Sequence, residues 1–263
     1  IGFETPSYVA AMQALYMAVT DKTGHCRNLE FDITPEDWPC VGLPDAILAD
    51  RGELLGYQIE SLESNFTVRI ENTPPYRGDA KGIVERNFKA IQASFGPFVP
   101  GYVSGTMVKK RGGKDYRLDA KLTVRDFAQI ILSSVLYHNQ YAVLEKYDRD
   151  ADMPADLPST PIHLWNWGLQ HRTGRLHQAD PDALRVALLP RQRATISDKG
   201  ACMFGIYYTS SELLQQGWLH RGRGVKRPAS IEAAYDPMVA DQIYLFPEKG
   251  SIKYWTCNLA DIS

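Results

Sequence analysis

The sequence predicts an α/β domain followed by a small antiparallel β-barrel, and three observations support this prediction. A strand–helix–strand pattern spans residues 46–71, which is typical of an α/β sheet. Two longer helical patterns follow, over residues 79–95 and 123–143. After Leu188 the pattern changes to short strands separated by Gly, Asp and Ser, which favours a small barrel.

The strand–helix–strand unit is preceded by a helix and begins with an apolar strand. Thr5-Pro6 is a helix start signal, and apolar residues at steps of three and four extend this first helix to Val19. The run Ala46–Asp50 is almost wholly apolar, which indicates a buried strand of a parallel or mixed sheet. A helix near 54–62 and an alternating strand over 67–71 complete a unit that should cross over in the right-handed sense.

The helix over residues 79–95 combines an apolar stripe with an acid. Val84, Phe88, Ile91 and Phe95 recur at helical spacing and are expected in the core. Glu85 lies on another face, which it shares with the polar side chains Lys81, Lys89 and Gln92. Two interpretations stay open at this point. The acid is either a member of an ordinary surface ion-pair ladder or a functional group that points into a site.

Two further helices are marked by their caps. A loop rich in Gly and Pro, over residues 96–113, separates them from the helix that carries Glu85. Thr123 and Asp126 have the spacing of a capping box, which predicts a helix from there to about Val143. Thr160-Pro161 starts another helix, whose tryptophans Trp165 and Trp167 are interpreted as packing anchors rather than as base-stacking platforms.

The barrel prediction rests on four short strand patterns, over residues 194–196, 205–208, 242–245 and 253–255. Between the second and third patterns lies the basic run His220–Arg227 (HRGRGVKR). Its glycines predict a flexible polycationic segment suited to phosphate contacts, which contribute affinity rather than sequence reading.

The composition is that of an ordinary globular protein, with 44% hydrophobic and 23% charged residues. No apolar run approaches the roughly 20 residues that a membrane span needs, so no membrane association is expected. The four cysteines lack C-x-x-C spacing, which favours free thiols in the cytoplasm. His25-Cys26 with Cys40 could begin a zinc site, although no further ligand follows at suitable spacing.

The net charge of −2 conceals two basic blocks. Residues 77–125 hold 11 Lys and Arg against 4 Asp and Glu, and residues 185–227 hold 8 against 2. The segments before, between and after them are acidic. One interpretation is that these charged blocks only keep the protein surface solvated. Because the first block surrounds Glu85, the distribution favours two contact surfaces for a polyanion such as DNA.

Several phrases of the sequence resemble a known family. They are LADRGE, NTPPYRGDAKGIVER, GGKDYRLDAKLT and TPIHLWNWG, and they are specific in combination and weak singly. Together they resemble the D-D-E transposases of the TnsB type, which are related to Mu transposase and more distantly to retroviral integrases. The resemblance covers nearly the whole chain. It implies a ribonuclease-H-like integrase catalytic core over residues 1–150, a helical connector over 151–187 and the small β-barrel over 188–263.

The resemblance also identifies two catalytic acids, Asp50 and Glu85, which lie 35 positions apart. An acid at the end of a strand and an acid within a helix can point at one small volume, and converging carboxylates suit Mg²⁺, with Mn²⁺ as a substitute. Glu53 and Asp79 are nearby alternatives for these two roles. Ile1-Gly2-Phe3-Glu4 resembles the end of the third strand of such a core, so the first catalytic aspartate is expected upstream, and the chain alone is expected to be inactive.

The implied activity is that of a magnesium-dependent polynucleotidyl transferase. It would cleave the 3′ ends of a transposon and join them to target DNA by two-metal chemistry. The alternative is a DNA-binding or assembly module of a transposition complex that has the fold without catalysis. The resemblance further implies self-association on DNA, an endonuclease partner, an ATPase regulator, and a place in the bacterial cytoplasm in association with the nucleoid.

The expected DNA contacts lie in the two basic blocks and on the helix of Glu85. They are Arg77, Lys81, Arg86, Lys89, Gln92, Lys109, Lys110, Arg111, Arg221, Arg223, Lys226 and Arg227.

Overall fold

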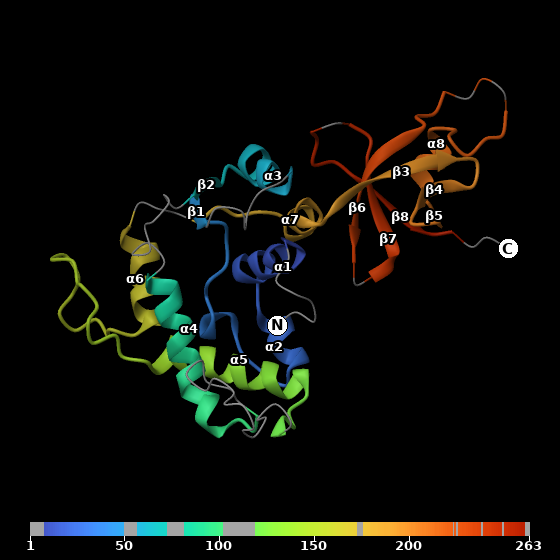
Figure 1. Cartoon of the computed structure of the whole chain (residues 1–263). Coiled ribbons are helices and arrows are strands. Elements are labelled where there is room, and N and C mark those ends of the chain that lie inside the picture. Colours follow the sequence, from blue (N-terminus) through green and yellow to red (C-terminus); the bar gives the residue numbers. More distant parts are fainter. Residues whose placement is uncertain are drawn as a thin grey trace. The chain divides into compact units, whose positions relative to one another are not determined.

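The computed structural model describes residues 8–49, 57–72, 82–101, 119–172, 176–222, 224, 226–237, 239–248 and 250–260. The chain forms two compact units, each of which joins segments distant in sequence. One unit contains residues 1–3, 19–41 and 73–176, and the other contains residues 4–18, 42–72 and 177–263. Figure 1 shows the elements of both units.

The first unit is helical in its described part. Its elements are α2 (Thr23–Asn28), η1 (Pro35–Asp37), α4 (Gly82–Phe95), η3 (Gly96–Phe98), α5 (Val124–Tyr141) and α6 (Pro161–His171). α5 packs against both α4 and α6. The rings of Phe95 on α4 and Phe127 on α5 meet edge to face, with centroids 5.6 Å apart.

The predicted capping box of α5 is confirmed. The Thr123 backbone N–H donates to Asp126 Oδ2 at 2.9 Å, and the Asp126 N–H donates to Thr123 Oγ1 at 3.1 Å. The hydrogen bonds from Thr123 hold the pKa of the Asp126 carboxyl below its usual value. Leu132 and Leu136 of this helix are buried against Cys26 of α2, which makes the small core of the unit.

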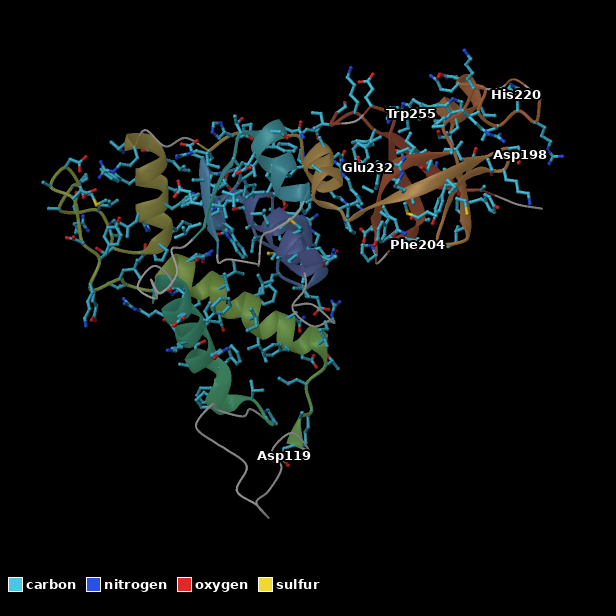
Figure 2. All side chains as sticks on the ribbon, turned by 45° about the horizontal axis from the view of Figure 1, so that its top comes forward. Asp119, Asp198, Phe204, His220, Glu232 and Trp255 are labelled. Carbon is cyan, nitrogen blue, oxygen red and sulfur yellow. The ribbon has the colours of Figure 1, made fainter. Side chains whose placement is uncertain are left out.

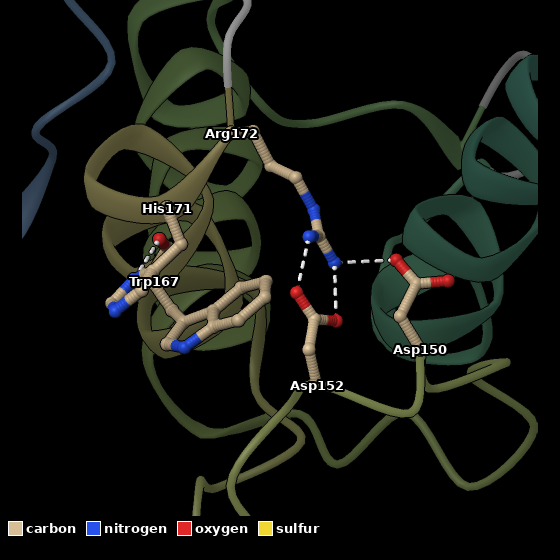
Figure 3. A network of polar contacts seen from close by, with 5 residues as sticks. All are labelled: Asp150, Asp152, Trp167, His171 and Arg172. Atoms are coloured by element: carbon tan, nitrogen blue, oxygen red, sulfur yellow. Dashed lines mark hydrogen bonds and ion pairs between the residues drawn. The ribbon is translucent and has the colours of Figure 1, made fainter.

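Two arginines, Arg172 and Arg149, form hydrogen bonds with the acidic loop before α6. Arg172 donates to Asp152 at 2.7 Å and to Asp150 at 2.5 Å, as Figure 3 shows. Hydrogen bonding to Arg172 lowers the pKa of the Asp152 carboxyl. The Arg172 guanidinium also lies 4.4 Å from the ring centroid of Trp167, which is buried. Trp167 is therefore a packing anchor, as predicted.

Inside the loop, Arg149 donates to the carbonyl oxygen of Leu157 and to Ser159 Oγ, both at 2.8 Å. Backbone groups of an irregular segment need such partners when they leave water. The Arg149 bonds therefore give this loop a fixed path within the first unit.

The second unit contains α1 (Tyr8–Val19) and a strand–helix–strand segment made of β1 (Ala46–Ala49), α3 (Tyr57–Phe66) and β2 (Arg69–Asn72). β1 and β2 pair in parallel, with Ala46 opposite Arg69 and Ala49 opposite Asn72. The predicted unit is thus present. The expectation that β1 is buried is wrong for its described side chains, because Leu48 is 54% exposed.

The C-terminal part of the second unit is a closed antiparallel barrel, as predicted. Its order is β3-β4-β5-β8-β7-β6. The strands are β3 (Arg191–Ser197), β4 (Gly200–Met203), β5 (Ile206–Thr209), β6 (Ser230–Asp236), β7 (Val239–Phe246) and β8 (Trp255–Leu259). Ile243, Leu245 and Ala233 fill the interior, together with Leu213 of the short helix α8 (Ser211–Gln215).

Helix α7 (Pro181–Leu188) packs against the outside of this barrel. Val186 and the following Leu189 lie against Ala234 and Phe246, and Arg185 Nη2 is 3.2 Å from Asp236 Oδ2. The same helix packs against α3. It therefore connects the barrel to the strand–helix–strand segment within the second unit.

All four cysteines are free, in agreement with the sequence, and Cys26 and Cys257 are buried. Cys40 is close to Lys22, a buried lysine whose Nζ donates to the carbonyl oxygens of Thr20 and Cys40. Burial lowers the pKa of this amine. Among the residues that the structure describes, no helix is both long enough and apolar enough to span a bilayer.

Burial of Cys257 inside the barrel predicts a pH dependence of stability. Burial raises the pKa of this thiol from 9.0 to about 11. The folded barrel therefore keeps a proton that the unfolded chain loses above its ordinary pKa, so the free energy of unfolding falls as the pH rises through this range. The expected loss between pH 9 and pH 11 is about 2 kcal/mol, measured by urea unfolding.

Burial also raises the pKa values of Tyr208 and Tyr254, which adds to the same trend. The matched comparison is therefore Cys257→Ala, which keeps both tyrosines. The difference in unfolding free energy between the original chain and this variant should depend on pH only above pH 9. A difference that is constant from pH 8 to pH 11 would contradict the prediction.

Candidate functional site

The first part of the candidate site is the carboxyl end of β1. Ala49 is the last residue of this strand and pairs with Asn72 of the parallel strand β2. Asp50 follows Ala49 directly in the sequence. The predicted acid therefore comes after the carboxyl end of a strand in a parallel pair, which is the edge at which α/β sheets place ligand-binding groups. The side chain of Asp50 itself lies outside the described residues.

β1 is held at its start by a segment from a distant part of the chain. Leu43 and His177 exchange backbone hydrogen bonds of 2.9 and 2.8 Å as an antiparallel bridge. His177 Nε2 is also 2.6 Å from Asp45 Oδ1, and the Asp45 carbonyl accepts from the Arg69 N–H. Sequence reasoning missed His177, since only the fold brings it to residues 43–45.

The second predicted acid, Glu85, belongs to the first unit, where α4 carries it in its first turn. The Glu85 side chain is exposed, and it forms no ion pair with the lysines and arginines that the structure describes, Lys89 included. The surface ion-pair ladder is therefore not formed with Lys89. Arg86, Lys89 and Gln92 are exposed on the same helix, where a polyanion can reach them.

The predicted core stripe of α4 is only partly correct. Phe95 is 8% exposed and packs on α5, whereas Phe88 is 64% exposed. Ser94 on the same end of α4 lies 3.4 Å from Ser134 of α5, so the C-terminal end of the helix is the end that touches its neighbour. Phe88 was expected in the core, and within the described part of its unit no element covers it.

Several predicted residues lie outside the described part of the chain. They are Asp50 and its alternatives Glu53 and Asp79, and the basic residues Arg77, Lys81, Lys109, Lys110, Arg111 and Arg223. Among the described residues, no group of three His, Cys, Asp or Glu side chains is arranged to hold a metal ion.

The second part of the candidate site is the basic loop between α8 and β6. Arg221 and Lys226 are exposed there, and Arg221 Nε is 2.8 Å from Asp198 Oδ2. Arg227 donates from Nη1 to the carbonyl oxygens of Trp218, at 2.9 Å, and His220, at 3.5 Å. Arg227 thus binds carbonyl groups of its own loop, whereas Arg221 contacts the turn between β3 and β4. The predicted flexibility of the loop stays a prediction.

Sequence reasoning also missed Lys199, which lies beside Asp198 in the turn between β3 and β4. Its side chain extends over the ring of Tyr207, with Nζ 5.8 Å from the ring centroid. A single lysine in a turn carries no signal in the sequence, and only the fold brings Arg221 to its neighbour Asp198. Figure 2 shows Asp198 and His220 on the same side of the barrel.

Known proteins resemble this chain along its whole length. Residues 1–101 match the family model of the TnsB C-terminal domain, and residues 185–254 match that of the Mu transposase C-terminal domain. The second match contains most of the barrel. The whole chain is 55% identical over 263 residues to the transposon Tn7 transposition protein TnsB of Escherichia coli. It spans 38% of the length of that protein.

Both matching segments and the identity along the entire chain point to one family. The predicted resemblance to the transposases of the TnsB type is therefore confirmed over the full length of the sequence.

Proposed function

We propose that the chain is the part of a DNA transposase that carries two of three catalytic acids and a DNA-binding barrel. The 55% identity to TnsB along all 263 residues supports this most strongly. The proposed reaction is cleavage at the 3′ ends of a transposon, followed by transfer of those ends to target DNA. The proposed arrangement is a ribonuclease-H-like core over 1–150, a helical connector over 151–187 and the barrel domain over 188–263.

Asp50 and Glu85 are the proposed metal-binding acids. Both offer carboxylate oxygens, which are the ligands that Mg²⁺ and Mn²⁺ prefer. Glu85 is exposed on α4, and none of the basic side chains that the structure describes forms an ion pair with it. When bound, a pair of such ions stabilises the negative charge that develops on the attacking and leaving oxygens at phosphorus.

The described elements support these assignments. The strand β1, which precedes Asp50 in the sequence, is paired with β2 over four residue pairs. Helix α4 carries Glu85 in its first turn. The exposed Arg86 and Lys89 adjoin Glu85 on α4, and we assign them to the phosphates of the DNA strand that is cut.

The other proposed DNA contacts are phosphate contacts as well. They involve Gln92 on α4, Arg77, Lys81 and Lys109 to Arg111 in the first basic block, and Arg221, Arg223, Lys226 and Arg227 in the second. The proposed ligands are transposon-end DNA and target DNA, with self-association on the DNA. An endonuclease partner, an ATPase regulator and a place in the bacterial cytoplasm near the nucleoid complete the proposal.

DNA binding by the chain is the direct test. Its affinity for duplex DNA, measured by fluorescence anisotropy, is expected to fall about 10²-fold between 50 and 200 mM salt, because several phosphate contacts release counterions. Lys89→Ala is expected to weaken binding more than Lys146→Ala, a change of an exposed lysine in an acidic segment. An affinity that is independent of salt, or equal effects of the two substitutions, would contradict the proposed contacts.

A further inference from the structure

Among the ion pairs given for described barrel residues, the most exposed one joins two segments that are far apart in sequence. Arg221, in the loop between α8 and β6, is 84% exposed and lies 2.8 Å through Nε from Asp198 Oδ2. Asp198 is 30% exposed and belongs to the turn between β3 and β4. One side of an exposed guanidinium is thus occupied by a carboxylate, in a region that is otherwise strongly basic.

The position of Asp198 is well defined. Its turn has two residues, since Ser197 and Gly200 are the last paired residues of β3 and β4. The Lys199 N–H donates to Ser197 Oγ at 3.2 Å, and Ser197 Oγ donates to the Gly200 carbonyl at 3.2 Å. The carboxylate is therefore presented by a turn that its own hydrogen bonds hold in place.

The neighbouring arginine has a different role. Arg227 is half-buried and donates to two carbonyl oxygens of its own loop, so it shapes the loop. Arg221 makes its contact at the surface instead. Residues 185–227 contain eight basic side chains and only two acids, Asp198 and Glu212. Of these two acids, Asp198 is the one that binds an exposed arginine.

A carboxylate and a phosphate compete for the same guanidinium geometry. Each presents a pair of oxygens that accept parallel N–H bonds from arginine. An exposed ion pair contributes little to stability, because water and salt screen it. A DNA phosphate can therefore replace the carboxylate at small cost. The counterions that the phosphate held are released when the arginine binds it.

We propose that Asp198 occupies the phosphate-binding position of Arg221 while the chain is free of DNA, and that a DNA phosphate displaces it on binding. Asp198 then lowers the affinity of the barrel for DNA in general and acts through Arg221. Lys199 follows Asp198 in the same turn, and its Nζ lies over the ring of Tyr207, so it is not the cation that Asp198 binds. This inference rests on the proposed DNA binding of the chain.

The experiment is a double-mutant cycle on duplex-DNA affinity at low salt. Asp198→Asn keeps the shape of the turn residue and is expected to tighten binding about fivefold by releasing Arg221. Arg221→Gln is expected to weaken binding and to reduce the slope of log affinity against log salt by about 1, since one phosphate contact is lost. In the Arg221→Gln background, Asp198→Asn should have less than half of its original effect.

The control is Glu212→Gln, which removes the other acid of the same basic block. This variant shows how much the DNA affinity rises when any one negative charge of the block is lost. Its gain in affinity should be smaller than the gain from Asp198→Asn. An equal gain from Asp198→Asn with and without Arg221 would overturn the proposal, as would weaker binding by Asp198→Asn. If the unsubstituted chain binds no DNA at low salt, the proposed DNA binding fails as well, and that result is distinguishable from the other two.

Discussion

Asp50→Asn and Glu85→Gln, each introduced alone into the full-length protein, are expected to slow strand transfer by on the order of 10³-fold, about 4 kcal/mol of activation free energy. Each substitution keeps the size of the side chain and removes the charge that holds a divalent cation. The measurement uses transposon ends that already carry a free 3′-hydroxyl, so that it reports the second step alone. It is repeated in Mg²⁺ and in Mn²⁺.

The same variants should bind end DNA within about twofold of the unsubstituted protein, because phosphate contacts and not these acids dominate affinity. Glu145→Gln, in an exposed loop position, is the matched control and should leave the rate unchanged. Glu53→Gln and Asp79→Asn test the alternative acids. If the Asp50 and Glu85 variants keep full activity and the Glu53 and Asp79 variants lose it, the catalytic acids are Glu53 and Asp79 instead. Full activity of all four variants would favour an assembly module.

The assignment of the acids shows what local sequence can and cannot predict. The end of β1 and the first turn of α4 follow from an apolar run and a helical period, and both elements are present close to their predicted bounds. Both patterns depend on residues close together in the sequence, so the two elements can be predicted without knowledge of what packs against them. That Asp50 and Glu85 meet is a statement about tertiary structure, and it stays a prediction.

Phe88 and Leu48 mark the limit of periodicity. A period of 3.6 groups Phe88 with Phe95 on one face, and an apolar run predicts a covered strand. Periodicity does not say which element supplies the cover. In the described parts of their units, only the Phe95 end of α4 meets α5, and β1 has one neighbouring strand, so Phe88 and Leu48 are exposed.

The barrel shows the opposite case, in which tertiary pairing overrides weak local preference. The sequence predicted a barrel but missed β4 and β6. β4 reads Gly-Ala-Cys-Met, and β6 contains Glu-Ala-Ala, neither of which favours a strand on its own. Each is nevertheless hydrogen-bonded to a strand on both sides, β4 to β3 and β5, and β6 to β3 and β7.

Contacts between side chains were harder to predict from the sequence than helices and strands. Arg221, Arg227 and His177 bind residues that are 23, 9 and 132 positions away. No period or motif links such positions, because their proximity depends on loops whose paths are set by the whole fold. Counting basic residues therefore located a cationic surface without showing that two of its arginines already have partners within the barrel domain.

Gly200→Ala is expected to destabilise the barrel by about 4 kcal/mol, the sum of backbone strain and overpacking. Gly200 has φ +126°, a conformation that side chains rarely adopt, and a Cβ there would overlap the carbonyl oxygen of Tyr208. Tyr208 pairs with Ala201 on one side and with Leu259 on the other. Moving this carbonyl therefore disturbs two strand pairs at once, and no flexible side chain is present at the point of overlap to give way instead.

Gly205→Ala is the matched control, since Gly205 lies in the next turn with φ +81° and a methyl group added there would have no neighbouring atom within 4 Å. It should cost only the backbone strain, about 1 kcal/mol. Urea unfolding followed by tryptophan fluorescence measures both, because Trp218 and Trp255 pack against the barrel core. Equal losses for the two variants would mean that the Tyr208 carbonyl can move freely, and that the closed barrel is less rigid than its pairing implies.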